Sequence, residues 1–317
     1  MYAIPTGCCL RFVRSAALID FIVEGHDHDL LLQPLEVANA QGHVTRIVSA
    51  GEFYEHVGRL RFVVDGPYVS FLDYKVLQVN RGTMPDPGVK AMVEVMKKEI
   101  VAKYGDVYRH PIGYALWDIE KRTKAERPER DSAMGNLVTD GVRAATHADI
   151  GMAATGFISE GIYQGPVVGA DVFRPLGYGY DPLGSGKDYP VVVATMTGAQ
   201  LLQALGLGVS LLGQTDALLL QVSGLSYRYD MSVADPRQRL IVSSVRVGCE
   251  PIDPARVCRV AANAMEVEIA QAMLQIKIPY TLAGYTEYDA VHGWVKKIGL
   301  LTYRPQGRIR DVSVVRR

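Results

Sequence analysis

The chain has 317 residues, of which 48% are hydrophobic and 21% are charged. This composition excludes a wholly disordered protein, and the length leaves room for about two domains. Lysine plus arginine and aspartate plus glutamate both total 34, so the formal net charge is zero. We therefore expect neither a nucleic-acid partner nor a membrane partner, because both favour a strongly basic surface.

The amino-terminal residues are not predicted to form a signal peptide. Residues 1–14 lack a basic stretch followed by an uninterrupted apolar core. No other stretch approaches the ~18 consecutive apolar residues that a membrane-spanning helix requires. The sequence therefore predicts a soluble chain without an export signal, and it leaves the localisation unknown.

The first 80 residues are predicted to be rich in β-structure. Four runs of apolar, β-branched or aromatic residues are bounded by turn-forming residues, at 18–23, 44–48, 60–65 and 69–79. No helical periodicity accompanies them. This part therefore resembles the end of a β-rich domain rather than a complete one.

A single amphipathic helix is predicted next. Asp86 and Pro87 supply a helix cap and a first-turn proline, and Val89, Met92, Val93, Met96 and Ile100 recur at helical spacing. Gly105 is expected to end the helix. Its position between two β-containing regions predicts a connector.

Two polar segments are interpreted as surface structure. Residues 120–131 are charged and poor in apolar side chains, which indicates a solvated loop or the edge of a strand. Residues 184–187 have the sequence Gly-Ser-Gly-Lys, but they lack the first glycine of a phosphate-binding loop, and Asp188 replaces its Ser/Thr. We expect this second segment to be a turn.

From Ser132 onward, helix and strand patterns are mixed. One helix is predicted to include Leu137, Val138, Val142 and Ala145, and a second to run from Thr197 to about Leu212. Strands are predicted at 149–153, 191–196, 218–222, 225–229, 241–247 and 257–262. Because helices and strands do not alternate strictly, the predicted fold class is α/β in the broad sense, specifically α+β or mixed α/β.

Cys249 and Cys258 flank a predicted turn in the last third of the chain. They could face each other across a hairpin and form a disulfide, or they could be two buried thiols. Their spacing does not match a zinc-binding or redox motif.

The run Gly25-His26-Asp27-His28-Asp29 is the strongest local chemical signal. In an extended backbone, residues two apart point to the same side, so the imidazoles of His26 and His28 can meet metal ions together. Asp27 and Asp29 could orient the two rings. On spacing alone, a His-x-His run is more often a surface loop than a metal site.

A strand that ends in Gly-His-x-His resembles the last metal-binding motif of the calcineurin-like metallophosphoesterases. Residues 47–60 are similar to the Ala-Gly-x-Tyr-x-x-x-x-Gly-Arg segment of the 5′-nucleotidase branch. Further similar segments follow in the order expected of the 5′-nucleotidase C-terminal domain, at 134–140, 148–150, 171–173, 196–201 and 221–230. The resemblance to the 5′-nucleotidase family covers roughly residues 18–265.

This resemblance implies three parts. Residues 1–84 would be the C-terminal remnant of a metallophosphoesterase domain, residues 85–118 a connector helix and linker, and residues 119–317 the substrate-binding domain. The implied activity is hydrolysis of nucleotides or related phosphoric monoesters with two divalent ions, such as Zn²⁺ or Mn²⁺. His26 and His28 would be metal ligands, and a full-length relative would be periplasmic or extracellular.

The other metal-binding motifs of the family are absent from this sequence. Asp-x-His, Gly-Asp and Gly-Asn-His-Glu/Asp would precede the Gly-His-x-His motif, but only 25 residues precede His26. We therefore assign no catalytic residue, and we expect a truncated chain that is inactive alone. Residues 1–80 would expose sheet edges and apolar faces, which predicts self-association.

The nucleoside-binding motifs also differ from the family pattern. Ser159 stands where the family has an arginine, and Tyr178 retains an aromatic face that could stack on a base. The late glycine-rich motif is absent after Asn263, and no motif connects Tyr285 or Tyr288 to its role. These differences support an alternative function, a non-catalytic nucleotide- or small-molecule-binding module that kept the C-terminal fold.

Overall fold

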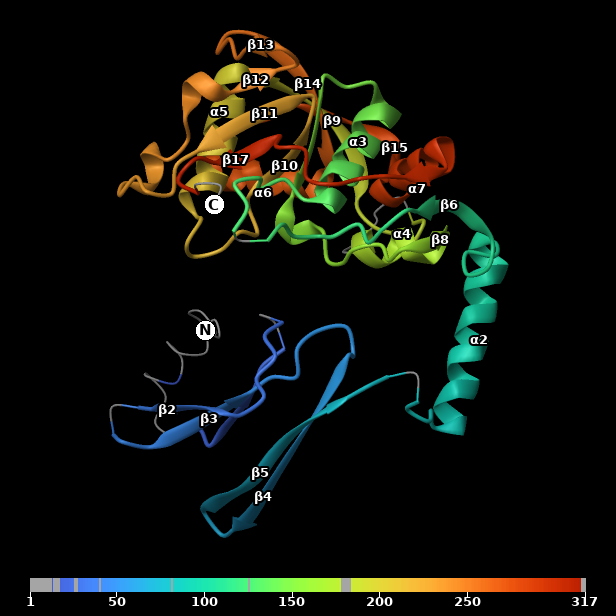
Figure 1. The fold of residues 1–317 in the computed structure, drawn as a ribbon, viewed down its shortest axis with the longest axis vertical. Helices are drawn as coiled ribbons and strands as arrows, with labels where there is room; N and C mark the ends of the chain where they lie inside the picture. Colours follow the sequence, from blue (N-terminus) through green and yellow to red (C-terminus); the bar gives the residue numbers. More distant parts are fainter. Residues whose placement is uncertain are drawn as a thin grey trace. The chain divides into compact units, whose positions relative to one another are not determined.

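The computed structural model describes residue 13 and residues 18–25, 28–39, 41–80, 82–124, 126–177 and 184–314. The chain divides into two compact units, residues 1–98 and 99–317 (Figure 1). The predicted domain boundaries at 84/85 and 118/119 stay predictions. Within the described ranges, every helix is too short or too polar to cross a bilayer.

A small sheet forms the first part of unit 1–98. Its strand order is β1 (Phe21–Val23), β3 (Val44–Val48) and β2 (Leu35–Ala38), with β1 parallel and β2 antiparallel to β3. Ile47 and Val48 of the middle strand are buried. The predicted strand at 44–48 is confirmed at both ends, because β-branched side chains suit a half-buried pleated surface.

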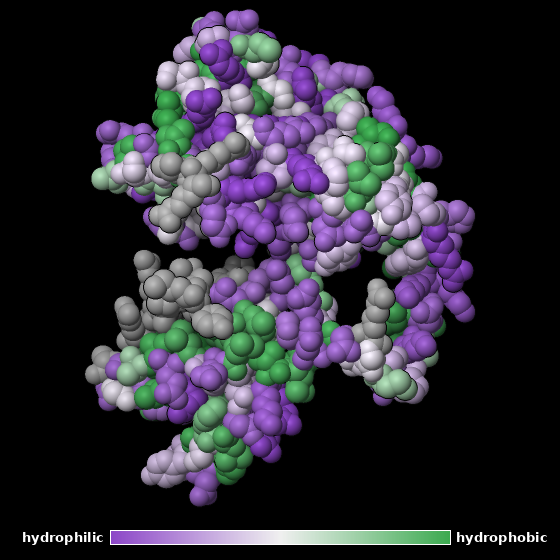
Figure 2. Space-filling view, in the orientation of Figure 1, coloured by the Kyte–Doolittle hydropathy of each residue, from purple (hydrophilic) through white to green (hydrophobic). Residues whose placement is uncertain are grey.

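A long hairpin follows, made of β4 (His56–Asp65) and β5 (Tyr68–Gln78). The ring centroids of Phe21 and Phe62 lie 5.2 Å apart, and the Tyr74 hydroxyl donates to the Ser49 carbonyl over 2.9 Å, so the hairpin packs on the small sheet. Much of its apolar surface remains exposed, including Val64 and Leu72. Figure 2 shows such apolar side chains gathered on the surface of this unit.

Helix α2 (Pro87–Tyr104) confirms the helix predicted after Asp86, while its role as a connector stays a prediction. The Val89 amide donates to Asp86 Oδ1 over 3.0 Å, as expected of an N-terminal cap. At the other end, Gly105 has a φ of +80° and its amide donates to the Val101 carbonyl. Glycine adopts this left-handed conformation without the steric cost that a Cβ would add, so the helix ends where the sequence predicted.

A five-stranded mixed sheet forms the centre of unit 99–317. Only β7 and β14 are parallel; every other neighbouring pair is antiparallel. The strand order is β10 (Leu220–Ser223), β7 (Ile150–Ala154), β14 (Val257–Asn263), β9 (Pro190–Thr197) and β15 (Tyr280–Thr286).

Both faces of this sheet are covered, as Figure 1 shows for the elements around it. Alternate strand residues point to opposite faces, so Val192 and Ala262 pack with helices α5 (Gly198–Ser210) and α6 (Ala264–Leu274). Their neighbours Val191 and Ala261 pack with α3 (Ala133–Thr146) and α7 (Glu287–Ile298). The result is a three-layer α/β domain, which confirms the predicted fold class.

Helix α3 approaches the sheet closely at Gly151. A Cβ on Gly151 would lie 2.2 Å from the Thr139 carbonyl oxygen of α3, which is shorter than any tolerated contact. The sheet and the helix can therefore meet at this distance only because residue 151 has no side chain.

The remaining elements surround this core. A four-stranded sheet has the order β13 (Glu250–Pro251), β12 (Arg246–Val247), β11 (Leu225–Tyr229) and β17 (Ile309–Asp311). A three-stranded sheet has the order β16 (Leu300–Leu301), β6 (Pro111–Ala115) and β8 (Gly165–Val168). Helix α4 spans Gly169–Leu176, and short 3-10 helices span Thr155–Phe157, Pro236–Gln238 and Val242–Ser244.

Two local predictions are wrong. The predicted strand at 241–247 is a 3-10 turn followed by the two-residue strand β12, because Ser243 and Ser244 interrupt the apolar run. Of the two alternatives for the cysteines, the disulfide does not form, and the alternative of two buried thiols is right for Cys258 but wrong for Cys249, which is exposed. Cys249 lies in the turn between β12 and β13, whereas Cys258 lies on β14 of a different sheet.

The end of the charged segment 120–131 is also buried, contrary to its interpretation as a solvated loop. The Asp131 side chain accepts hydrogen bonds from Asn136 Nδ2 at 2.8 Å and from the amides of Gln306 and Gly307 at 2.6 and 2.9 Å. This carboxylate joins the start of α3 to the segment that leads into β17. Among the described residues of this segment, the one strand-like feature is a bridge between Glu129 and Arg310.

We expect Asp131→Ala to lower the free energy of unfolding by about 3 kcal/mol, because it leaves several buried donors without an acceptor. Urea denaturation measures this change. The matched control is Glu250→Ala, at an exposed acidic position, which should shift stability by less than about 0.5 kcal/mol. Equal effects of the two substitutions would contradict the structural role of Asp131.

Candidate functional site

His28 is the one predicted metal ligand whose position can be described, since His26 lies outside the described residues. Its Nδ1 atom lies 2.7 Å from Glu52 Oε2, and its side chain is 44% exposed. Its φ of +62° is unusual for a non-glycine residue and costs about 1 kcal/mol, which is a feature that concentrates at functional sites. A metal-binding histidine commonly gives its second ring nitrogen to a carboxylate in this way, which leaves Nε2 directed at the ion.

The described residues do not form a complete metal centre. Among them, no group of three or more His, Cys, Asp or Glu side chains is arranged to hold an ion. A two-metal phosphohydrolase needs bridging oxygen ligands as well as imidazoles. His28 therefore fits the role of one ligand, while the described part of the chain does not fit the two-metal centre as a whole.

Two stretches stand where the family has nucleoside-binding motifs, residues 154–159 and the residues after Asn263, and they meet at one edge of the central sheet. We call them the substrate segments, although a substrate role stays a prediction for both. The amide of Ala154, at the end of β7, donates to Glu266 Oε1 on α6 over 2.5 Å, so residues 154–159 contact the segment that follows Asn263. Ser159, at the position of the family arginine, donates its hydroxyl to the Arg174 carbonyl over 2.9 Å. Tyr178 lies outside the described residues, so its predicted stacking role stays a prediction.

Three buried carboxyl groups occupy this edge, and we call them the carboxyl cluster: Asp188, Glu266 and Glu287. Asp188 Oδ2 accepts from the Tyr288 amide over 2.8 Å, and Asn263 Nδ2 donates to Glu287 Oε2 over 3.4 Å. One oxygen of each carboxyl group is buried without a hydrogen-bond partner. No ammonium or guanidinium ion pair with these carboxyl groups is present among the described residues.

This environment favours the protonated form of each group. Burial, and second to it the nearby Glu287, raise the pKa of Asp188 to about 8. Burial also raises the pKa of Glu266 and Glu287 well above the ordinary value, with Glu266 contributing to the shift of Glu287. The partial positive charge at the starts of α6 and α7 does not compensate fully for this desolvation.

The carboxyl cluster was missed from sequence because its members are far apart along the chain. A signal was nevertheless present at two helix starts. Asn263-x-x-Glu266 and Thr286-x-x-Asp289 both match the pattern of an N-terminal cap followed by an acidic residue at the third helical position. Both caps are formed, so these spacings could have located α6 and α7 and the carboxyl groups at their starts.

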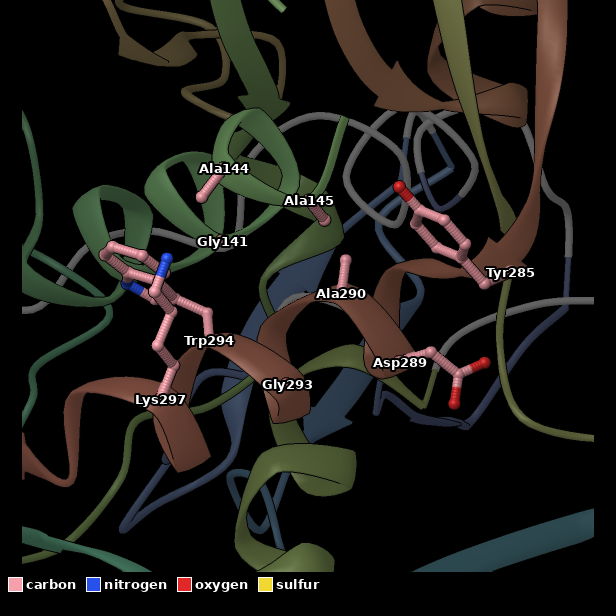
Figure 3. A pocket seen from close by; sticks show the side chains of 9 residues that line it. All are labelled: Gly141, Ala144, Ala145, Tyr285, Asp289, Ala290, Gly293, Trp294 and Lys297. Atoms are coloured by element: carbon pink, nitrogen blue, oxygen red, sulfur yellow. The ribbon is translucent and has the colours of Figure 1, made fainter. Parts of the chain in front are cut away.

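A separate surface groove of about 410 Å³ runs between α3 and α7 (Figure 3). Small residues form its floor, among them Gly141, Ala144 and Gly293. Trp294 and Lys297 lie at one end, whereas Tyr285 and Asp289 lie at the other. Lys297 Nζ sits 5.5 Å from the centroid of the Trp294 ring, so its charge already has a partner within the same helix.

Comparison with known families identifies the larger unit. Residues 111–268 match the 5′-nucleotidase C-terminal domain. The chain is a divergent member of the 5′-nucleotidase family. The match spans α3, four of the five strands of the central sheet (β7, β9, β10 and β14) and the start of α6, and it therefore includes both substrate segments and Glu266.

The relatives extend beyond the family domain. The trifunctional nucleotide phosphoesterase protein YfkN of Bacillus subtilis is 25% identical over 320 residues, which is 96% of this chain and 20% of that protein. The chain thus spans about a fifth of the length of this curated relative. A 5′-nucleotidase precursor from Thermus thermophilus has a TM-score of 0.79 at 24% identity, covering 96% of this chain and 61% of the other.

The sulfate thiohydrolase SoxB of Thermus thermophilus is also similar in structure, with a TM-score of 0.70 at 20% identity. The match covers 98% of this chain and 53% of that one. At this identity the likeness concerns the fold alone. The same fold therefore occurs in a protein whose name describes different chemistry from a nucleotidase.

The carboxyl cluster gives a prediction about pH. Its carboxyl groups have higher pKa values in the folded than in the unfolded chain, so they stabilise the fold fully below about pH 4 and lose this contribution as pH rises toward 8. Glu266→Gln and Glu287→Gln remove the titrating proton. Between pH 5 and pH 9, we expect the free energy of unfolding to fall by about 2 kcal/mol less in each variant than in the wild type.

Denaturant unfolding at a series of pH values measures this difference. Glu250→Gln is the matched control, since Glu250 is exposed and its substitution should leave the wild-type pH profile unchanged. Parallel profiles for the wild type and for both cluster variants would contradict the assignment.

Proposed function

We propose that this chain is part of a phosphoric monoester hydrolase of the 5′-nucleotidase type, acting on nucleotides or related phosphate esters. The observation that carries the proposal is the 5′-nucleotidase C-terminal domain at residues 111–268. The relationship to a nucleotide phosphoesterase of Bacillus subtilis supports the same class of reaction. In the intact family, divalent ions polarise the phosphate and activate the attacking water.

Within this arrangement, His26 and His28 would supply imidazole ligands to an ion such as Zn²⁺ or Mn²⁺. The contact between His28 and Glu52 supports that role, because a carboxylate on Nδ1 fixes the ring and holds Nε2 free for the metal. The described residues contain no group of three or more His, Cys, Asp or Glu side chains that could hold an ion. We therefore propose that catalysis requires further ligands, supplied by polypeptide outside the described residues.

A second candidate function is binding without catalysis. The contact of Glu266 with the Ala154 amide supports this second function. Through it, the buried carboxyl group of Glu266 joins the two segments that the family resemblance assigns to the nucleoside. Ser159 has no positive charge to offer a phosphate or a ribose hydroxyl, and its hydroxyl is already bonded to backbone carbonyls. A ligand of this module would therefore bind through other residues.

We expect the purified chain to show no turnover of AMP or 4-nitrophenyl phosphate in the presence of Mn²⁺ or Zn²⁺, above the rate of the metal in buffer. Release of inorganic phosphate measures the activity. The expectation follows from the incomplete ligand set, since two imidazoles cannot hold two ions in open coordination.

The control for any observed activity is a pair of histidine substitutions. His28→Ala should abolish turnover that depends on the proposed centre. His110→Ala should leave it unchanged, because His110 is an exposed histidine that pairs with Asp106. Turnover that is abolished by His28→Ala alone would show that the chain is catalytically complete. Binding of a nucleotide without turnover would favour the second candidate.

A further inference from the structure

A cavity of about 660 Å³ lies in unit 99–317, and none of the residues that line it belongs to either substrate segment. Its walls are the last turn of α2, the start of α4, the loop at 184–187 and one face of α7. All of these residues belong to one compact unit. The volume is in the range of small-molecule sites in proteins, which are commonly lined by rings and a few placed charges.

A row of aromatic rings lines one side of the cavity. The Phe173 and Tyr288 centroids are 6.0 Å apart at an interplanar angle of 69°, and those of Tyr288 and His292 are 5.4 Å apart at 31°. Phe173 is 41% exposed, so part of its ring is open to an added molecule. Burial lowers the pKa of His292 and raises that of Tyr288 to about 12, so the row is uncharged near neutral pH.

Positive charge lies next to this aromatic row, since Lys187 Nζ is 5.4 Å from the centroid of the Tyr288 ring. Lys103 of α2 and Lys187 of the loop both line the cavity. A Cβ added to Gly186 would lie 3.4 Å from Lys103 Nζ and 2.9 Å from the Tyr104 hydroxyl, so this ammonium group lies against the loop that carries Lys187. The Tyr104 hydroxyl donates to the Ser185 carbonyl over 2.7 Å and holds the helix and the loop together.

One acidic side chain, Asp289, also lines the cavity, and its charge is already compensated. It forms an ion pair with Lys187 and accepts hydrogen bonds from the amide and hydroxyl of Thr286, which caps α7. The cavity lining therefore contains two lysines and one carboxylate, and that carboxylate is already paired with Lys187. The cavity combines uncharged ring faces with a net positive charge.

We propose that this cavity binds a small aromatic anion, with its ring on the row of Phe173, Tyr288 and His292 and its phosphate or carboxylate beside Lys103 and Lys187. Stacking accounts for the aromatic part, and charge-assisted hydrogen bonds from the ammonium groups account for the anionic part. Such a ligand would join the last turn of α2 to α4 and α7. The proposal is independent of hydrolysis, because none of these residues belongs to the proposed metal ligands or to the segments at 154–159 and 263–266.

The test is isothermal titration calorimetry of the full chain with AMP, adenosine and inorganic phosphate as separate probes. AMP should bind, adenosine should bind at least about tenfold more weakly, and phosphate should give no saturable heat at the same concentrations. AMP affinity should fall as NaCl is raised, because salt screens the ammonium groups. A benzoate probe shows whether a carboxylate can replace the phosphate.

Substitutions then locate the site. Lys103→Ala, at an exposed position, and Phe173→Ala should each weaken AMP binding about tenfold, with unchanged circular dichroism. Lys297→Ala is the matched control, because Lys297 lies in the groove between α3 and α7. The proposal is overturned if AMP does not bind at millimolar concentration, if adenosine binds equally well, or if Lys297→Ala weakens binding as much as Lys103→Ala. Phosphate release, measured in the same samples, reports separately on the proposed hydrolase.

Discussion

The hydrogen bond between Asp188 and the Tyr288 amide fixes the start of α7, and much of the larger unit depends on that helix. Asp188 precedes β9, so the bond ties a central strand to the helix that covers one face of the sheet. It also sets the position of Tyr288 and His292 on the wall of the cavity. Asp188 also belongs to the carboxyl cluster, so the same residue takes part in the packing of α7 and in the protonation of the buried carboxyl groups.

The polar groups of the larger unit that could meet a ligand lie in two places, the carboxyl cluster and the cavity lined by Phe173, Tyr288 and His292. At the sheet edge, buried acidic groups meet the segments that the family resemblance assigns to the nucleoside, and Ser159 stands where the family has an arginine. In the cavity, lysines and rings offer what an anionic aromatic molecule needs. Divergence within the family can therefore retain the three-layer fold while it moves the polar groups that meet a ligand.

Sequence reasoning predicted elements well where periodicity and end signals agreed. The helix at Pro87–Tyr104 had a cap, an apolar spacing and a terminal glycine, and the strand at Val44–Val48 had turn residues on both sides. It failed at 241–247, where serines broke an apolar run, and at Asp131, whose burial depends on amides 175 and 176 positions away. Contacts at that separation leave no local pattern in the sequence.

The candidate site was predictable only in part for the same reason. Two histidines that are two positions apart in a strand-to-loop motif are visible in one short segment. Asp188, Glu266 and Glu287, in contrast, become neighbours only through the pairing of β9, β14 and β15. Lys187 was correctly placed in a turn rather than in a phosphate-binding loop. Its place beside α7 could not be inferred, because Asp289 is 102 residues away.

The positions of Cys249 and Cys258 give the larger unit two thiols with very different access to reagents. Cys249 is exposed in a turn and can react in the native protein, whereas Cys258 is paired opposite Met196 in the middle of the central sheet. Burial also raises the pKa of Cys258, so little thiolate forms there. Alkylation of Cys258 therefore requires local opening of the core that covers it, so the rate of this reaction reports how often that opening occurs.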